Sequence, residues 1–341
     1  MKLMMELEAR GYDIVIRRGS LQRASMLGNF ARKVLVVSDT GVPEQYIKTI
    51  MQQCGEAYSI VVPQGEESKS ITQFGAILSR LLELGFGRTD AVAAVGGGVV
   101  GDLAGFAAAA YMRGIDFFQF PTTTLAQIDS SIGGKVAIDF EGAKNIVGAF
   151  HQPKLVVVDP DTLQTLPERH WSNGLAEALK TGLIGSAPLF EMLEKEDVHQ
   201  KIESILFESL LYKKGVVERD ETEKGERMLL NFGHTIGHAI ESASGFDRDK
   251  GGLLHGECVG LGMLPMIESR TLRKRTKAVL KKLNLPLQCP CTADEIIQNL
   301  SNDKKRRGNT YNIVKVSALG KGRIETVDFE ELCLLAREAA E

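Results

Sequence analysis

The sequence predicts an α/β N-terminal domain with a Rossmann-like parallel sheet, followed by a mainly α-helical C-terminal domain. Up to residue 165, short apolar runs alternate with helical segments, and this alternation is typical of a parallel sheet. Beyond residue 165 the apolar residues recur at helical spacing, apart from a late pair of strands near residues 312–317 and 322–326. We therefore predict two domains, residues 1–165 and 166–341.

The composition of the 341-residue chain is that of an ordinary globular protein, with 43% hydrophobic and 25% charged residues. A net charge of -3 argues against a nucleic-acid partner, because binding to phosphates needs an excess of Lys and Arg. We expect no membrane partner, because the sequence has no signal peptide and no apolar run of about 20 residues. Its 5 cysteines lack CxxC spacing and favour a reducing cytoplasm.

The first strands can be located from their apolar residues. Residues 12–16 alternate in the manner of a strand, and residues 33–37 form a continuous apolar run that ends shortly before Asp39. An Asp at the carboxyl end of such a strand commonly contacts a cofactor ribose. Asp39 is therefore a candidate cofactor ligand, although it could instead cap a helix that starts near Pro43.

A glycine cluster interrupts the strand–helix pattern. A strand over residues 58–62 and a helix over 71–84 precede a buried strand over 91–95, which stops at Gly96, Gly97 and Gly98. A helix is expected over residues 101–111. Free N–H groups and a positive helix end then meet at one point, as in sites that bind a dinucleotide pyrophosphate. The spacing is not G-x-G-x-x-G, and the glycines alone could form only a tight turn.

Polar and cationic residues follow the next predicted strand, residues 117–120. The strand ends in a hydroxyl-rich segment, residues 121–124, and several functional side chains then occur among glycines: Asp129, Lys135, Lys144 and Asn145. Two lysines, an Asp and an Asn in such a short segment favour an anion or cofactor site over ordinary surface loops.

The second half contains the residues of a candidate metal site. We expect a helix that is capped by Ser172 or Asn173, contains Glu177 and Lys180, and ends at Gly182. Glu177 and Lys180 share one face of this helix, and by themselves they would indicate a surface ion pair.

Histidines are concentrated further along the chain. If residues 227–238 are helical, four polar side chains lie along one side: Arg227, Asn231, His234 and His238. The motif is not H-E-x-x-H, because no Glu follows His234. His255 precedes a helix expected over residues 258–267. Glu177, His234 and His255 could form a three-ligand site with an open position, as in a catalytic zinc centre, or the histidines could be ordinary core residues.

Two cationic stretches remain ambiguous. Lys213 and Lys214 end a predicted helix whose periodicity cannot choose between them, and residues 303–308 form a charge run of the kind that usually lies in a solvated loop.

Taken in order, the glycine turn and the segments GGK, AKN, AEALK, NFGHTIGH and LHGE resemble the 3-dehydroquinate synthase family over nearly the full length. The resemblance implies a cytoplasmic homodimer that uses NAD and one divalent metal ion, zinc or cobalt. It also implies conversion of a sugar phosphate, 3-deoxy-D-arabino-heptulosonate 7-phosphate, into 3-dehydroquinate and phosphate. In the implied reaction NAD is transiently reduced, phosphate is eliminated, the hydride returns, and an internal aldol reaction closes the ring.

The resemblance also assigns residues. The family's metal ligands fall on Glu177, His234 and His255. Lys135, Lys144 and Asn145 would lie between cofactor and substrate. The remaining cofactor contacts fall on Gln64, Gly65, Glu66, Glu67, Ser68, Lys69, Gly98, Val99, Val100, Gly101, Asp102, Thr122, Thr123, Thr162, Leu163, Gln164 and Thr165.

By the same resemblance, Lys213 and Arg227 would bind the substrate carboxylate, while Asp129 would contact metal-bound hydroxyls and Lys180 would support the charge of the site. The phosphate would be bound by Lys135, Asn145, Asn231, His238 and Lys305, with Arg113 contributed across a dimer interface. Lys304 remains an alternative to Lys305.

The sequence departs from the family pattern at three places, and three other functions remain as alternatives. Val136 follows the GGK segment where a Thr is common, the connection between His238 and His255 is longer than usual, and the DKKRRGN run is unusual. The rivals are a cyclase for a different sugar phosphate, a metal-dependent alcohol dehydrogenase related to glycerol dehydrogenase, and a binding protein without turnover.

Overall fold

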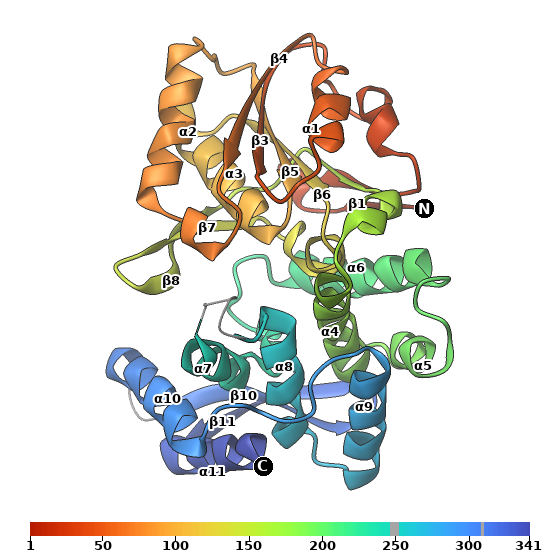
Figure 1. Cartoon of the computed structure of the whole chain (residues 1–341), viewed down its shortest axis with the longest axis vertical. Helices are drawn as coiled ribbons and strands as arrows, with labels where there is room; N and C mark the ends of the chain where they lie inside the picture. Colours follow the sequence, from red (N-terminus) through yellow and green to blue (C-terminus); the bar gives the residue numbers. More distant parts are fainter. Residues whose placement is uncertain (246–251, 308–309) are drawn as a thin grey trace. The chain divides into compact units, whose positions relative to one another are not determined.

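The chain divides into two compact units, Met1–Pro167 and Glu168–Glu341 (Figure 1). The computed structural model describes residues 1–245, 252–307 and 310–341, with the side chains of residues 302–307 left outside the description.

The first unit contains a seven-stranded sheet with the order β1-β2-β9-β6-β5-β3-β4. Only β1 is antiparallel to its neighbour, and every other pairing is parallel. The strands are β1 Lys2–Met5, β2 Tyr12–Ile16, β3 Lys33–Asp39, β4 Glu56–Val62, β5 Ala91–Gly96, β6 Asp116–Pro121 and β9 Leu155–Val158. The predicted Rossmann-like α/β class is confirmed.

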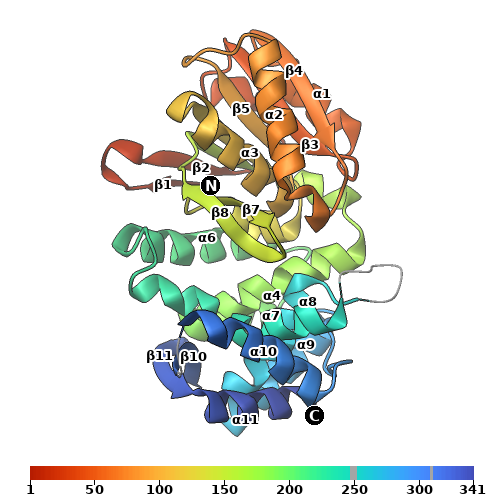
Figure 2. The same ribbon diagram turned by 90° about the vertical axis from the view of Figure 1, so that its left-hand side faces the viewer.

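Three helices cover this sheet, and the alternation of side chains along β3 explains how. Val34 and Val36 pack into the cluster that contains residues of α1 (Glu44–Met51). Leu35 and Val37 face the opposite side, together with residues of α2 (Ile71–Glu83) and α3 (Gly98–Ala110). A strand buried on both faces tends to be apolar on both, which is why residues 34–37 form a continuous apolar run without polar alternation. Figure 2 shows α2 and α3 over the same face.

The strand order creates a topological switch point between β3 and β5. The chain passes from β3 outward to the edge strand β4 and then returns to β5 on the other side of β3. In open parallel sheets, ligands bind outside the carboxyl ends of the strands at such a point. Asp39 ends β3 here, and Gly96 ends β5.

A β-hairpin of β7 (Lys135–Phe140) and β8 (Ala143–Phe150) also belongs to the first unit and was not predicted from the sequence. Its two-residue turn, Glu141-Gly142, has φ angles of 49° and 75°. Two successive positive φ angles are typical of the type I′ turn, whose twist matches that of a hairpin. Lys144 and Asn145 therefore lie beside a hairpin turn, whereas Lys135 pairs with Phe150 at the far end.

The second unit is mainly helical, as predicted, with one antiparallel strand pair. Its described elements are α4 Glu168–Ile184, α5 Ala187–Lys195, α6 Ile202–Arg219, α7 His234–Ser244, α8 His255–Met263, α9 Arg270–Lys282, α10 Ala293–Arg307, β10 Thr310–Ala318, β11 Lys321–Asp328 and α11 Phe329–Ala340. No helix in the described segments combines the length and apolar character needed to cross a lipid bilayer.

Three local predictions in this unit were wrong. Helix α4 begins at Glu168, so Ser172 and Asn173 do not cap it, and it continues beyond Gly182. A Cβ atom at Gly182 would lie 2.8 Å from the backbone nitrogen of Phe190, so this glycine allows α5 to pack closely rather than ending α4. Helix α6 likewise continues past Lys213 to Arg219.

The segment from Arg227 to His238 is not one helix. A 3-10 helix, Glu226–Asn231, ends at Phe232, and Gly233 adopts a left-handed conformation with φ of 79° before α7 starts. Glycine adopts this conformation without steric penalty, so it can reorient the chain between the two helices. His234 thereby becomes the first residue of α7, with His238 one turn further along.

Candidate metal centre and dinucleotide crevice

One carboxylate and two imidazoles converge within the second unit. Glu177 projects from the middle of α4, whereas His234 and His255 are the first residues of α7 and α8. The Glu177 Oε1 atom lies 3.7 Å from His234 Nε2 and 3.6 Å from His255 Nε2. Ligand atoms about 2 Å from a tetrahedral zinc ion are about 3.3 Å apart, so these separations fit a shared ion after small adjustment.

The Glu177 carboxylate has the environment of a ligand rather than of a satisfied core group. It is 1% exposed and forms an ion pair with Lys180. Both imidazole contacts are too long for hydrogen bonds. The Lys180 ammonium lies against Oε2, whereas Oε1, the oxygen that faces both imidazoles, has no hydrogen-bond partner among the described residues. A buried carboxylate that faces two imidazole nitrogens is a donor set that suits Zn²⁺ or Co²⁺.

His238 belongs to the same histidine cluster. Its ring centroid lies 5.3 Å from that of His234 and 5.7 Å from that of His255. One ligand atom from each of the three histidines fits within 4.8 Å of the others, so the geometry also allows a three-histidine set. His238 is exposed, whereas Glu177 is buried between the other two imidazoles. We therefore favour Glu177 as the third ligand and His238 as a neighbour of the open position.

The Nδ1 atoms of the two candidate ligands have their own partners. His234 Nδ1 lies 3.2 Å from the backbone oxygen of Phe232, and His255 Nδ1 lies 3.2 Å from Oε2 of Glu241. Both rings therefore turn Nε2 toward Glu177. Glu241 was not among the residues predicted from the sequence; its only signal there is its position seven residues after His234, on the same face of α7.

Burial and the neighbouring charges strongly shift the pKa values of the three residues in this cluster. Burial lowers the pKa of His234 to about 3, with Lys180 acting in the same direction, so this imidazole is neutral. Burial also lowers the pKa of His255, but its contacts with Glu177 and Glu241 outweigh burial and raise it to about 10. For Glu177, burial would raise the pKa, whereas Lys180 and the histidines hold it well below its usual range.

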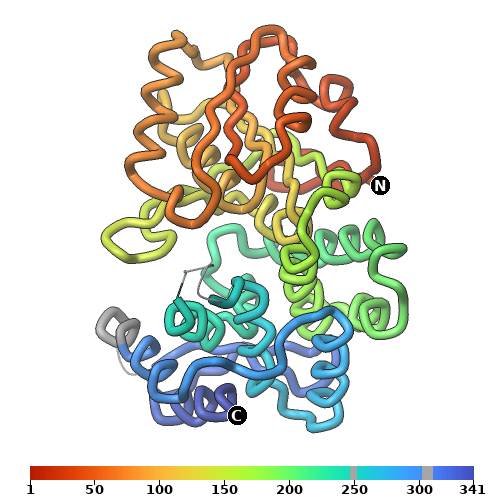
Figure 3. The backbone as a smooth tube through the Cα atoms, in the orientation of Figure 1, coloured from red at the N-terminus to blue at the C-terminus, as the bar shows by residue number. Residues whose placement is uncertain are grey.

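Close backbone contacts set the positions of the helices that carry these candidate ligands. A Cβ atom at Gly262 of α8 would lie 2.7 Å from the backbone nitrogen of Gly237 of α7, so the two helices approach main chain to main chain. Figures 1 and 3 show α7 and α8 side by side. Gly256 donates its backbone N–H to Asn173 Oδ1 at 2.6 Å, which joins the start of α8 to α4. Arg169 of α4 also pairs with Glu257 of α8 at 2.7 Å.

The predicted carboxylate-binding residues of the second unit are both buried. Lys213 on α6 is 7% exposed and Arg227 is 2% exposed. Lys214, the alternative to Lys213, instead forms an ion pair with Glu218 at 2.8 Å. Arg227 donates from its side chain to the backbone oxygen of Glu221.

Asp220 organises the loop that leads to Arg227. Its carboxylate accepts hydrogen bonds from the backbone nitrogens of Lys224, Gly225 and Arg227 at 2.7 to 3.0 Å. These bonds lower the pKa of Asp220, with that from Lys224 contributing most. Of the predicted phosphate contacts, Asn231 donates to Glu223 Oε1 at 2.8 Å, whereas the Lys305 side chain lies outside the described residues.

In the first unit, Lys69 connects three elements near the carboxyl ends of the strands. Its ammonium group donates to Asp102 of α3 at 2.7 Å and to the side-chain oxygen of Asn145 on β8, with Glu66 at 3.7 Å. Its backbone oxygen accepts a hydrogen bond from Asp139 of β7. Burial lowers the pKa of Lys69, but Asp102 and Glu66 outweigh this effect and raise it. These contacts join the loop after β4 to α3 and the hairpin.

The other predicted cofactor residues surround the carboxyl ends of the strands. Asp39 accepts a hydrogen bond from the backbone of Gly41 at 2.7 Å and does not cap α1. The start of α3 has no side-chain cap, so the first N–H groups of Gly98, Val99 and Val100 remain suited to an anion. Gly101 also serves packing, because a Cβ atom there would lie 3.0 Å from the Gln119 side chain.

Several of these predicted cofactor residues also have structural partners. Thr123 accepts a hydrogen bond from Ala126, and Thr162 accepts one from Gln127 at 2.9 Å. Gln64 and Ser68 fix the loop after β4 through bonds to Thr40 and Pro63. The rest of the predicted set lies in segments that follow the strand ends: Gly65, Glu67, Thr122, Leu163, Gln164 and Thr165. Asp102 lies in the first turns of α3, and Asp129 lies in the short π-helix Ala126–Ser130. Arg113 lies in an exposed turn after α3.

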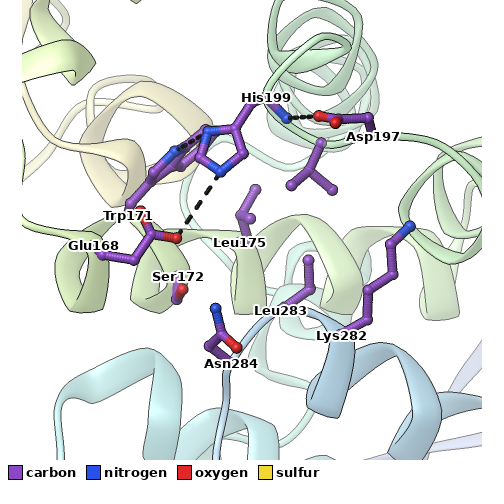
Figure 4. A pocket seen from close by; sticks show the side chains of 10 residues that line it. Glu168, Trp171, Ser172, Leu175, Asp197, His199, Lys282, Leu283 and Asn284 are labelled. Atoms are coloured by element: carbon purple, nitrogen blue, oxygen red, sulfur yellow. Dashed lines mark hydrogen bonds and ion pairs between the residues drawn. The ribbon is translucent and has the colours of Figure 1, made fainter.

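A cavity of about 190 Å³ lies elsewhere in the second unit (Figure 4). The cavity is lined by the start of α4, by the connection after α5 and by the end of α9. Trp171 Nε1 donates to His199 Nδ1 at 2.6 Å across one wall. None of the predicted site residues lines it, so this cavity is not part of the metal centre.

Comparison with known proteins identifies the family. The family models described as 3-dehydroquinate synthase N-terminal and C-terminal match residues 59–173 and 174–306. Similar curated relatives are 3-dehydroquinate synthases of Clostridium botulinum and Streptococcus suis. The first is 38% identical, with 96% of this chain and 99% of the relative covered, and the second is 40% identical, with 97% and 98% covered.

Solved structures extend this similarity. A 2-deoxy-scyllo-inosose synthase complexed with carbaglucose-6-phosphate, NAD+ and Co²⁺ is 26% identical with a TM-score of 0.88, over 99% of this chain and 100% of that chain. A 2-epi-5-epi-valiolone synthase of Streptomyces hygroscopicus with NAD+ and Zn²⁺ bound is 26% identical with a TM-score of 0.85, over 98% and 99%. A probable glycerol dehydrogenase from Sinorhizobium meliloti, 16% identical with a TM-score of 0.62 over 96% of each chain, shares the fold. From the family matches and the identity to curated relatives, this chain belongs to the 3-dehydroquinate synthase family.

Proposed function

We propose that the chain is a carbon–oxygen lyase that converts 3-deoxy-D-arabino-heptulosonate 7-phosphate into 3-dehydroquinate and phosphate, in the shikimate route to aromatic amino acids. The observation that carries this proposal is the buried Glu177 carboxylate, which faces the Nε2 atoms of His234 and His255. The curated relatives of the chain are named as 3-dehydroquinate synthases, the enzymes of this reaction. The curated relatives are 38–40% identical, whereas the cyclases for other substrates are 26% identical, which favours this substrate.

We infer that NAD and one divalent ion, Zn²⁺ or Co²⁺, are the cofactors, because the similar cyclase structures contain them. Glu177, His234 and His255 would hold the ion. The pyrophosphate of NAD would bind the start of α3, with Asp39 toward a ribose. When bound, NAD accepts and returns a hydride, and the metal ion acidifies the substrate hydroxyls that it contacts.

Cationic and polar side chains would then orient the substrate. Lys213 and Arg227 would bind its carboxylate, and a guanidinium suits this role because it can donate two parallel hydrogen bonds. The residues proposed for the phosphate are Lys135, Asn145, Asn231, His238 and Lys305, with Arg113 of the partner subunit. Held in this way, the phosphate itself can accept the proton that is lost before elimination.

Two more residues would act at the metal centre. Asp129 would contact the hydroxyls presented by the substrate, and Lys180 would keep Glu177 ionised through the observed ion pair. We also propose that the protein is a cytoplasmic homodimer.

Inorganic phosphate release from the heptulosonate phosphate tests the proposed reaction. We expect release with catalytic NAD and no net NADH, and loss of release after treatment with a chelator, restored by Zn²⁺ or Co²⁺. Accumulation of NADH in proportion to product would instead indicate a dehydrogenase. Absence of phosphate release from the metal-loaded protein would refute the proposal.

The His234→Ala variant tests the metal assignment. Because His234 contributes a neutral ring to the site, its removal should abolish bound metal and turnover while the fold survives. His199→Ala is a matched control, because His199 contacts Trp171 at the separate cavity and its variant should retain metal. Elemental analysis and circular dichroism provide the measurements. Full metal content in His234→Ala would remove this residue from the ligand set.

A further inference from the structure

Glu241 is a buried carboxylate to which the proposed reaction assigns no role. It lies on α7, two turns after His234, and is 8% exposed. Its Oε2 atom lies 3.2 Å from Nδ1 of His255, which belongs to the neighbouring helix α8. The carboxylate therefore connects the helix of one candidate metal ligand to the ring of the other.

The chemistry of the two groups fixes the direction of this contact. An ionised carboxylate can only accept a hydrogen bond, so His255 Nδ1 must carry the proton and donate. A neutral imidazole that is protonated on Nδ1 has its lone pair on Nε2. His255 Nε2 is the atom that faces Glu177 at 3.6 Å. The contact with Glu241 thus selects the tautomer that can bind a metal ion.

We propose that Glu241 is a positioning residue that orients His255 and fixes its tautomer for metal binding. The inference rests on the metal site of the proposed function. His234 does not need such a residue, because its Nδ1 atom already faces the backbone oxygen of Phe232 at 3.2 Å. The two imidazoles are therefore oriented by different means: a main-chain carbonyl for His234, and one side chain for His255.

This asymmetry makes the role of Glu241 measurable. Partners that orient a metal-bound histidine typically contribute 10- to 100-fold in metal affinity. Glu241→Gln retains a side-chain oxygen that can accept the Nδ1 proton, whereas Glu241→Met has a similar volume and no comparable acceptor. A loss of orientation should therefore appear in the Met variant and be much smaller in the Gln variant.

Zinc affinity, measured by competition with a chromophoric chelator, tests the proposal. We expect Glu241→Met to bind Zn²⁺ about 10- to 100-fold more weakly than the unsubstituted protein, with Glu241→Gln in between. Glu194→Gln is the matched control, because Glu194 pairs with Arg275 in the same unit and should not affect zinc binding. In the cobalt-loaded protein, the visible absorption bands should shift in the Met variant and remain unchanged in the control.

Equal zinc affinity in the folded Met variant and the unsubstituted protein would overturn the proposal, even if the Met variant melts at a lower temperature. If the Met variant does not fold, nitrogen-15 spectra of the zinc-loaded unsubstituted protein decide instead. A proton on His255 Nδ1 supports the role of Glu241, and an unprotonated Nδ1 overturns it. Failure of the unsubstituted protein to bind zinc would refute the metal site itself, so the two failures can be distinguished.

Discussion

Burial of opposite charges on α4 organises the candidate metal centre. Glu177 and Lys180 are each 1% exposed. Removing two charges from water costs several kcal/mol per ion, and only close partners offset that cost. The ion pair with Lys180 and the positively charged ring of His255 supply these partners for Glu177.

The proton balance of this cluster predicts how metal binding depends on pH. His255 is a cation in the metal-free protein because its pKa is raised to about 10, whereas His234 is neutral because its pKa is lowered to about 3. A metal ion must displace the proton from His255, so binding should release one proton and affinity should rise about tenfold per pH unit between about pH 7 and 9.

Calorimetric titration of the metal-free protein with Zn²⁺, in buffers of different ionisation enthalpy, measures the number of protons released. The expected number is one at pH 8. If no proton is released and the affinity is constant above about pH 7.5, His255 has an ordinary pKa and the prediction is wrong.

At the scale of single residues, the candidate metal ligands could be predicted from the sequence, but not all of the residues that hold the site in place. A Glu and two His separated by many residues could be proposed as ligands from residue type and family resemblance. Glu241 and Asp220 could not be found in the same way, because their roles depend on where α7 begins and how the loop before Arg227 turns.

Glycines decide how closely several elements approach. In α3, a Cβ atom at Gly105 would contact the Val136 side chain and would lie 2.9 Å from Phe117. In α2, which also has 13 residues, a Cβ atom at Gly75 would meet no atom within 4 Å. Both glycines therefore lie inside helices of equal length, but Gly105 is tightly packed and Gly75 borders open space.

Substitution of each glycine by alanine should therefore have opposite effects on the free energy of unfolding. Gly105→Ala should destabilise the protein by about 1–3 kcal/mol through overpacking. Gly75→Ala should stabilise it by about 0.5–1 kcal/mol, because alanine loses less backbone entropy in a helix. Urea denaturation measures both changes. Similar effects in the two variants would show that packing at Gly105 is not limiting.

Whether a helix or strand could be predicted from the sequence depends on how completely it is buried. Strands buried on both faces, such as β3 and β5, are continuous apolar runs and could be predicted almost residue by residue. The β7–β8 hairpin could not, because much of β8 is exposed and its turn uses Glu141-Gly142 rather than the commoner Asn-Gly. The broken helix around Gly233 had a periodic pattern on both sides, and only the left-handed glycine separates the two parts.

For the whole molecule, the main open proposal is the homodimer in which Arg113 reaches the partner's site. Arg113 lies in an exposed turn in which Met112, Arg113 and Gly114 all have positive φ angles. Arg113 is exposed in the single chain and therefore accessible to a second copy.

Subunit complementation tests this arrangement. Arg113→Ala and His234→Ala homodimers should each have low activity. After the two variants are mixed under conditions that exchange subunits, a mixed dimer contains one site with both intact residues if Arg113 acts across the interface. Phosphate release should then recover. If mixed dimers form but activity does not recover, Arg113 acts within its own subunit or has no role.

The main-chain contact between α7 and α8 has a consequence for how this protein can vary. Because Gly262 meets the backbone of Gly237 directly, the spacing between the two imidazole-bearing helices is independent of the bulk of nearby apolar side chains. Substitutions among those apolar neighbours can therefore change the melting temperature while the distance between the two imidazole rings stays the same.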